Sequence, residues 1–143
     1  MKILLALDDS KFSEAAAKSL VSQLRSDDTE VKVLHVIEPV VALEPPQMSP
    51  GYYPELEEQL PQARELVDRM AKIVSSAGFK VSASVTTGDA RSMILKEAAE
   101  WHADLIVVGS HGRKGLERFF LGSVSEAVAR YADCSVQIVR FPK

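Results

Sequence analysis

A glycine-containing loop between a buried strand and a helix start constrains this chain more than any other stretch. Residues 103–108 form a short apolar run rich in β-branched residues, a pattern typical of a buried strand. The run leads directly into Gly109 and Gly112, and glycine adopts backbone angles that other residues avoid. The loop is therefore predicted to turn sharply and to lie close to a ligand.

A helix start follows this loop. Gly122 precedes Ser123-Val124-Ser125-Glu126, a Ser-x-x-Glu pattern typical of a capping box, and apolar residues then recur at helical spacing as far as Tyr131. The first backbone N–H groups of a helix have no partner within it and suit phosphate oxygens. The same pattern caps many helices that bind nothing, so alone it favours a binding role only modestly.

The whole chain alternates predicted strands with predicted helices. Apolar runs predict strands at residues 2–7, 31–37, 79–87, 103–108 and 135–141. Helical spacing predicts four helices: one from Asp9 or Ser10 to near Asp27, one from Leu60 to Gly78, one from Asp89, and one after Gly122. Pro61 fits only in the first turn of its helix. This alternation indicates an α/β fold with an open parallel sheet and right-handed crossovers, whose ligand binds where the strand order reverses.

The spacing Gly-x2-Gly-x9-Gly-Ser closely resembles the nucleotide-binding motif of the universal stress protein family, in its ATP-binding branch. The four matching residues are Gly109, Gly112, Gly122 and Ser123. Other stretches resemble the family in the same order: residues 2–10 its first strand ending in Asp-x-Ser, 34–36 its second strand, 88–90 the turn before its third helix, and 135–140 its last strand. The resemblance covers nearly the whole chain.

The resemblance implies a fold more specific than the alternation alone. It implies a single domain over residues 1–143, with a five-stranded parallel sheet in the order 3-2-1-4-5 and helices on both faces. This is an adenine nucleotide alpha hydrolase-like, Rossmann-like arrangement. In that order strands one and four are neighbours, so Asp8 and Gly109 flank one crevice.

The resemblance also implies which residues hold the nucleotide. Asp8 and the Val36 backbone recognise the nucleoside, the loop after the fourth strand follows the ribose and phosphates, and the start of the last helix closes on the phosphate tail. The implied set is Ala6, Leu7, Asp8, Ser10, Val36, Gly109, Ser110, His111, Gly112, Arg113, Gly122, Ser123, Val124 and Ser125. The ligand is ATP, AMP or ADP, and Mg²⁺ on the phosphates is plausible because this ion relies on phosphates more than on protein ligands.

Structural alternatives stand beside these roles. Asp8 can cap the first helix, Ser123 can cap its own helix, and Val36 can be a core residue. His111 and Arg113 can be solvated loop residues. His35 and His102 are interpreted as structural.

The chain departs from the common family pattern in two places. Asp9 replaces a residue that is often small or apolar, and it adds negative charge near the expected nucleotide. Residue 90 is alanine where many relatives carry proline. The change at Asp9 concerns the affinity for the nucleotide, and the change at residue 90 concerns the start of the third helix.

Other functional classes fit the sequence less well. The first βα turn, Asp8-Asp9-Ser10-Lys11, lacks the glycines of a dinucleotide fingerprint, and Gly122-Ser123 lacks the lysine of a P-loop. No Cys-His, Ser-His-Asp or zinc pattern is evident, so hydrolysis is expected to be slow. The resemblance to the universal stress protein family implies an ATP-binding stress-response protein that acts as a nucleotide-dependent switch or sensor. A slow ATPase or nucleotidyl-transfer enzyme, and an interaction module with a vestigial site, are the alternatives.

Composition limits the partners. A chain of 143 residues with a formal net charge of −3 has no broad basic field for nucleic acid or anionic membranes. The N-terminal apolar run, residues 3–7, is too short for a signal peptide core, so a cytoplasmic protein is expected. Cys134 is the single cysteine and is read as a small buried thiol.

The last predicted strand suggests an assembly. In the implied order the strand Ser135 to Phe141 lies at an edge, where an apolar run invites pairing with a second copy of the chain. Members of the resembled family commonly dimerise through this strand, so a homodimer is expected. A protein partner and the role of the proline-rich residues 38–54 are left open.

Overall fold

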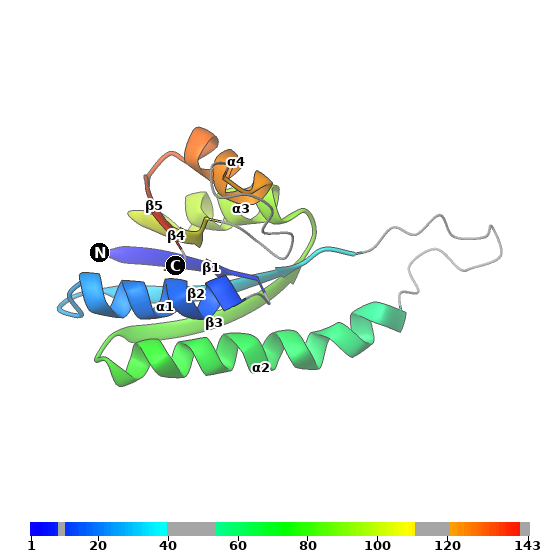
Figure 1. The fold of residues 1–143 in the computed structure, drawn as a ribbon, viewed down its shortest axis with the longest axis horizontal. Helices are drawn as coiled ribbons and strands as arrows, with labels where there is room; N and C mark the ends of the chain where they lie inside the picture. Colours follow the sequence, from blue (N-terminus) through cyan, green and yellow to red (C-terminus); the bar gives the residue numbers. More distant parts are fainter. Residues whose placement is uncertain (9–10, 40–53, 111–120, 141–143) are drawn as a thin grey trace.

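The protein forms a parallel sheet covered by helices (Figure 1). The computed structural model describes residues 1–8, 11–39, 54–110 and 121–140. Its strands are β1 (Lys2–Leu7), β2 (Glu30–Ile37), β3 (Lys80–Thr87), β4 (Leu105–Gly109) and β5 (Ser135–Val139). Its helices are α1 (Lys11–Gln23), α2 (Pro54–Ser76), α3 (Ala90–Trp101) and α4 (Ser123–Tyr131). The five strands run parallel in the order β3-β2-β1-β4-β5, which confirms the expected fold and strand order.

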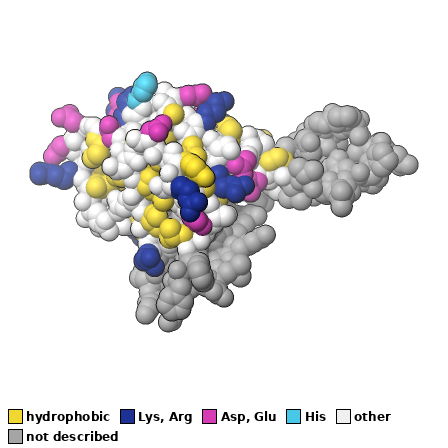
Figure 2. Space-filling model, turned by 90° about the horizontal axis from the view of Figure 1, so that it is seen from above, with side chains coloured by type: hydrophobic (Ala, Val, Ile, Leu, Met, Phe, Trp, Pro, Cys, Tyr) yellow, Lys and Arg dark blue, Asp and Glu magenta, His cyan; other side chains and the backbone are white. Residues whose placement is uncertain are grey.

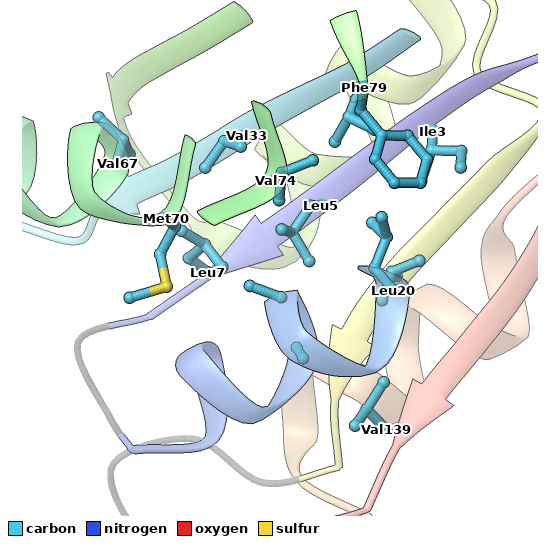
Figure 3. Close-up of a cluster of buried hydrophobic side chains, with 14 of the residues drawn as sticks. Ile3, Leu5, Leu7, Leu20, Val33, Val67, Met70, Val74, Phe79 and Val139 are labelled. Atoms are coloured by element: carbon cyan, nitrogen blue, oxygen red, sulfur yellow. The ribbon is translucent and has the colours of Figure 1, made fainter. Parts of the chain in front are cut away.

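The central strand β1 is buried on both faces because its sequence is continuously apolar. Ile3, Leu5 and Leu7 pack into a cluster with side chains of α1 and α2, such as Leu20 and Met70 (Figure 3). Leu4 and Ala6 point to the opposite face and pack into a second cluster with residues of α3 and α4. Helices therefore cover both faces of the sheet, as expected.

The strand predicted at residues 79–87 is β3, which lies at one edge of the sheet. Val81, Ala83 and Val85 pack against the α1/α2 cluster, while the residues between them are exposed or half-buried. The turns on either side of β3 use Gly78 at φ +96° and Gly88 at φ +150°, where a side chain is strained.

Helix α1 is shorter than predicted. It ends at Gln23 instead of near Asp27. The chain then makes a turn in which the Thr29 N–H donates to the Ser26 carbonyl at 3.2 Å and Asp28 takes the left-handed φ of +52°. Aspartate tolerates that conformation better than most residues, so the turn replaces a last helical turn.

Helix α2 is longer than predicted. It begins at Pro54, not near Leu60, so Pro61 lies inside the helix and not in its first turn. Proline suits the first helical position, and Pro54 fits there just as Pro61 was expected to. Pro61 has no N–H for the helical ladder, so the helix loses one backbone hydrogen bond at that position.

Two properties of the surface bear on partners. Within the described ranges no helix combines the length and apolar composition needed to cross a membrane. Figure 2 shows basic and acidic side chains interspersed over the face that it presents, with hydrophobic side chains between them. The coloured part of this face therefore carries no broad area of one charge.

Candidate functional site

The strand order reverses between β1 and β4, which lie side by side. The chain leaves β1 toward α1 on one face of the sheet, and after β4 its next described helix, α4, lies on the other face. Asp8 follows β1 and Ser110 follows β4 at the same edge, because the strands are parallel. Open α/β sheets bind ligands at this kind of point.

Ser110 ties three elements together at this edge. Its N–H donates to the Val139 carbonyl at the end of β5 at 2.8 Å, and its carbonyl accepts the Gly122 N–H at 2.8 Å. The Ser125 hydroxyl lies 3.0 Å from the same carbonyl and 3.0 Å from the Gly122 carbonyl. Because Ser110 and Ser125 are both buried, these bonds fix the start of α4 against the end of β4.

The start of α4 differs from the predicted capping box by one residue. The N-cap is Gly122, which has no side chain to cap the helix, and the Glu126 N–H donates to the Gly122 carbonyl at 2.9 Å. Ser123 is therefore the first helical residue, and the prediction that it caps the helix with Glu126 is wrong. The N–H groups of the first turn, from Ser123 to Ser125, have no acceptor within the helix itself.

The two described glycines of the motif, Gly109 and Gly122, do not have positive φ. Gly122 has φ −63° and ψ 159°, which any residue adopts. Positive φ values among the described glycines occur at Gly78 and Gly88 only, so Gly109 also departs from the expectation of unusual angles. Backbone angles therefore do not require glycine at position 122. What glycine provides there is the absence of a side chain beside the start of α4.

Asp8 is held by a side chain from α1. Its N–H donates to the Ser13 hydroxyl at 2.8 Å, and that hydroxyl lies 3.0 Å from the Asp8 Oδ1 and also contacts the Asp8 carbonyl. Ser13 is buried, with 4% of its surface exposed. The alternative that Asp8 caps the first helix stays a prediction, because the contact that Asp8 makes with α1 is to the Ser13 side chain and not to a backbone N–H of the helix.

A histidine holds the residue before Asp8. The His35 Nδ1 on β2 lies 3.0 Å from the Leu7 carbonyl oxygen. His35 was expected to be structural, and the sequence did not point to Ser13. A polar Ser13 between the apolar Phe12 and Ala16 of an amphipathic helix was the one available signal.

The other candidates occupy the same edge or the core beside it. Gly109 is the last residue of β4 and pairs with Val139. The side chains of Ala6 and Val36 are buried in the cluster under α3 and α4, whereas Leu7 is buried on the opposite face. Of the implied set, Ser10, His111, Gly112 and Arg113 lie outside the described residues. The structure thus brings Asp8, Val36, Gly109, Ser110 and residues 122–125 to one edge of the sheet.

Helix α3 starts at the same edge and is capped by carboxylates. Asp89 accepts the Ser92 N–H at 3.1 Å and the Ser92 hydroxyl at 2.9 Å, and these two bonds lower the pKa of Asp89 below its ordinary value. The Glu38 carboxylate accepts the Ala90 N–H at 2.9 Å. The departure at position 90 therefore provides a donor that proline lacks.

Metal-ligating and thiol chemistry find little support in the described residues. No group of three or more His, Cys, Asp or Glu in those ranges could hold a metal ion. Cys134 is half-buried, and burial raises the pKa of its thiol, which lowers its reactivity.

Known proteins share both the sequence and the fold of this chain. Universal stress protein MJ0531 of Methanocaldococcus jannaschii is 34% identical over 144 residues, which cover 99% of this chain and 83% of that protein. The solved structure of hypothetical protein MJ0577 matches with a TM-score of 0.83 and 30% identity, covering 99% of this chain and 96% of that one.

More distant structures share the fold and were solved with nucleotides. A universal stress protein family protein of Arabidopsis thaliana with AMP bound matches with a TM-score of 0.73 and 21% identity, covering 99% of this chain and 92% of that one. The universal stress protein of Archaeoglobus fulgidus in complex with dAMP matches with a TM-score of 0.70 and 22% identity, covering 97% of each chain.

The match to a family is nearly complete along the chain. The model of the Universal stress protein family matches residues 1–140. Together with the relative that is 34% identical over nearly the full chain, this match settles the family. The chain belongs to the universal stress protein family.

Proposed function

We propose that this chain binds an adenine nucleotide, ATP in particular, at the carboxyl ends of the neighbouring strands β1 and β4. We propose also that it acts as a nucleotide-dependent switch or sensor in the stress response. One observation carries the proposal: buried bonds through Ser110 fix the start of α4 at the point of strand reversal, and its cap, Gly122, has no side chain. A helix start of this kind suits phosphate oxygens. The AMP and dAMP in structures of the same fold support an adenine nucleotide as the ligand.

The proposed roles divide along the edge. Asp8 and the Val36 backbone contact the nucleoside beside Ala6, and Leu7 takes part through its backbone, because its side chain is buried on the opposite face. The backbone N–H groups of residues 122–125 contact the phosphates, and Mg²⁺ is carried on those phosphates. Because the one proton of the Ser125 hydroxyl is already shared between the Ser110 and Gly122 carbonyls, we assign the contribution of Ser125 to its backbone N–H. Ser10, Ser110 and residues 109–113 complete the set, as the family motif implies.

The test is nucleotide binding by the purified protein and by Gly122→Val. Mass spectrometry of small molecules released from fresh protein identifies the ligand, and calorimetry compares AMP, ADP and ATP. Valine is compatible with the Gly122 angles, so the variant is expected to fold while its side chain blocks the approach of phosphate. We expect ATP affinity to fall at least about hundredfold, or about 2.7 kcal/mol. Equal affinities of the two proteins would refute the assignment.

We also propose a homodimer paired through β5. This strand is at the edge of the sheet, so one row of its N–H and C=O groups faces away from β4. On one face of β5 the partly buried Val136 and Ile138 pack against the cluster under α3 and α4, and on the other face the Gln137 amide donates to Gln23 of α1 at 2.7 Å. Antiparallel pairing about a two-fold axis would satisfy both edges. Light scattering at micromolar concentration tests this pairing, and the mass of a single chain would refute it.

A further inference from the structure

We propose that His35 is a positioning residue of the nucleotide site, acting with Ser13 to hold the peptide that carries Asp8. The proposal rests on the proposed function and adds a residue outside the Gly-x2-Gly-x9-Gly-Ser motif. It predicts that a histidine with no place in that motif controls affinity for the nucleoside part of the ligand.

The peptide between Leu7 and Asp8 is held at both of its polar groups. Its carbonyl oxygen lies 3.0 Å from the His35 Nδ1, and its N–H donates to the Ser13 hydroxyl at 2.8 Å. A carbonyl only accepts hydrogen bonds, so the His35 Nδ1 carries the proton. The two holding side chains come from different elements, β2 and α1, and together they fix the plane of this peptide.

Ser13 extends this control to the carboxylate. Its hydroxyl lies 3.0 Å from the Asp8 Oδ1 as well as beside the Asp8 carbonyl, and its one proton is donated to one of these oxygens at a time. Since Ser13 is buried, this contact is shielded from competing water. His35, in contrast to Ser13, is half-buried. Its hydrogen bond to the Leu7 carbonyl fixes the end of β1, which Asp8 directly follows.

The functional consequence follows from preorganisation. A binding group that is already oriented does not lose conformational freedom when the ligand arrives. Without the His35 donor, the peptide can rotate and swing the Asp8 carboxylate away from the nucleoside. The loss is expected at the nucleoside end of the site, so adenosine and ATP should weaken by the same factor. Gly122→Val, in contrast, should weaken ATP far more than adenosine.

The experiment compares His35→Leu with His35→Asn in the full chain, by calorimetry with adenosine and with ATP. Leucine fills a similar volume without a donor, whereas the asparagine amide places a donor close to where Nδ1 lies. We expect His35→Leu to weaken both ligands about tenfold, the size of one hydrogen bond, and His35→Asn to stay within about threefold of the wild type. Ser92→Ala, which removes a side-chain hydrogen bond from α3 at the same edge, is the matched control and should leave both affinities unchanged.

A measurement on ligand-free protein keeps the proposal testable if His35→Leu does not fold. Nitrogen NMR of the wild type should show the neutral His35 ring protonated at Nδ1. Protonation at Nε2 alone would overturn the proposal, and so would wild-type affinity in His35→Leu or a loss confined to ATP. If the wild type itself bound neither adenosine nor ATP, the proposed function would fail first, and the positioning role with it. Binding by the wild type therefore separates the two failures.

Discussion

The starts of α3 and α4 lie at the carboxyl ends of the strands and on the same face of the sheet, but they are capped in different ways. At α3, Asp89 caps the helix through Ser92 and Glu38 accepts the Ala90 N–H. At α4, the cap is Gly122, and the ties that fix the helix run through carbonyl oxygens. One helix start is occupied by the protein's own carboxylates, and the other has no carboxylate at its cap.

The difference matters because a helix N-terminus carries a partial positive charge that favours one anion nearby. The lowered pKa of Asp89, caused mainly by its bonds with Ser92, keeps a negative charge at α3. A phosphate would be repelled there. At α4, the first-turn acid Glu126 pairs with Arg130 at 3.3 Å along the helix surface. The comparison therefore indicates α4 as the phosphate end of the proposed site.

The largest expected effect comes from giving α4 the cap of α3. Gly122→Asp should cap the first turn and complement the helix dipole, so the free energy of unfolding should rise by about 0.3–1 kcal/mol. Its side chain and charge should lower ATP affinity at least about hundredfold, or about 2.7 kcal/mol. Denaturant unfolding and calorimetry measure the two quantities.

Gly122→Asn is the matched control for charge. It caps the helix and obstructs the site to a similar extent but adds no negative charge, so ATP should bind it more tightly than Gly122→Asp by about tenfold. An aspartate variant that bound ATP as well as the wild type would show that α4 is not the phosphate end.

The sequence predicted well those features that depend on local apolar runs. The strand predicted at residues 2–7 is confirmed as β1, whose nearly continuous apolar run is buried on both faces. The strand predicted at residues 79–87 is confirmed as β3. The order of the strands came from the family resemblance, because local patterns do not specify which strands pair.

Features decided by distant contacts were missed. The cap of α4 was assigned to Ser123, but the Ser110 carbonyl accepts the Gly122 N–H and the helix begins one residue earlier, with Gly122 as its N-cap. His35 and Leu7 are 28 residues apart, so no local pattern relates them. The start of α2 was missed for a local reason: Pro54 and Pro61 both fit a first helical turn, and the helix begins at the earlier of the two.

A smaller effect is expected when α3 loses its cap. Asp89→Ala removes the acceptor for two groups of Ser92 and should lower the free energy of unfolding by about 1 kcal/mol. The binding of ATP should not change, because α3 contributes no residue to the proposed site. Denaturant unfolding and calorimetry again provide the measurements, and a loss of ATP affinity equal to that of Gly122→Val would remove the distinction between the two helices.

This stabilisation should depend on pH. Since the folded pKa of Asp89 lies below its ordinary value of 3.8, the carboxylate contributes stability above that value. The contribution is lost as the pH falls from there through the lower folded pKa. The difference in unfolding free energy between wild type and Asp89→Ala should therefore be full near about pH 7 and smaller near about pH 2.5. A difference that grew in acid would have the wrong sign.

The smallest effect is expected from Ala90→Pro, which restores the residue that many relatives carry. Proline removes the N–H that donates to Glu38, but Ala90 is the first helical residue, where proline is favoured. Asp89 already has φ −74° and ψ 123°, the extended conformation that proline requires of its predecessor. Proline lowers the conformational entropy of the unfolded chain, and this gain should offset the loss of the exposed hydrogen bond to Glu38. The unfolding free energy should therefore change by less than about 0.5 kcal/mol. Glu38→Gln completes a double-mutant cycle. It should lower the free energy of unfolding slightly in the wild-type background and leave that of Ala90→Pro unchanged. The same loss in both backgrounds would mean that Glu38 acts elsewhere than on the start of α3.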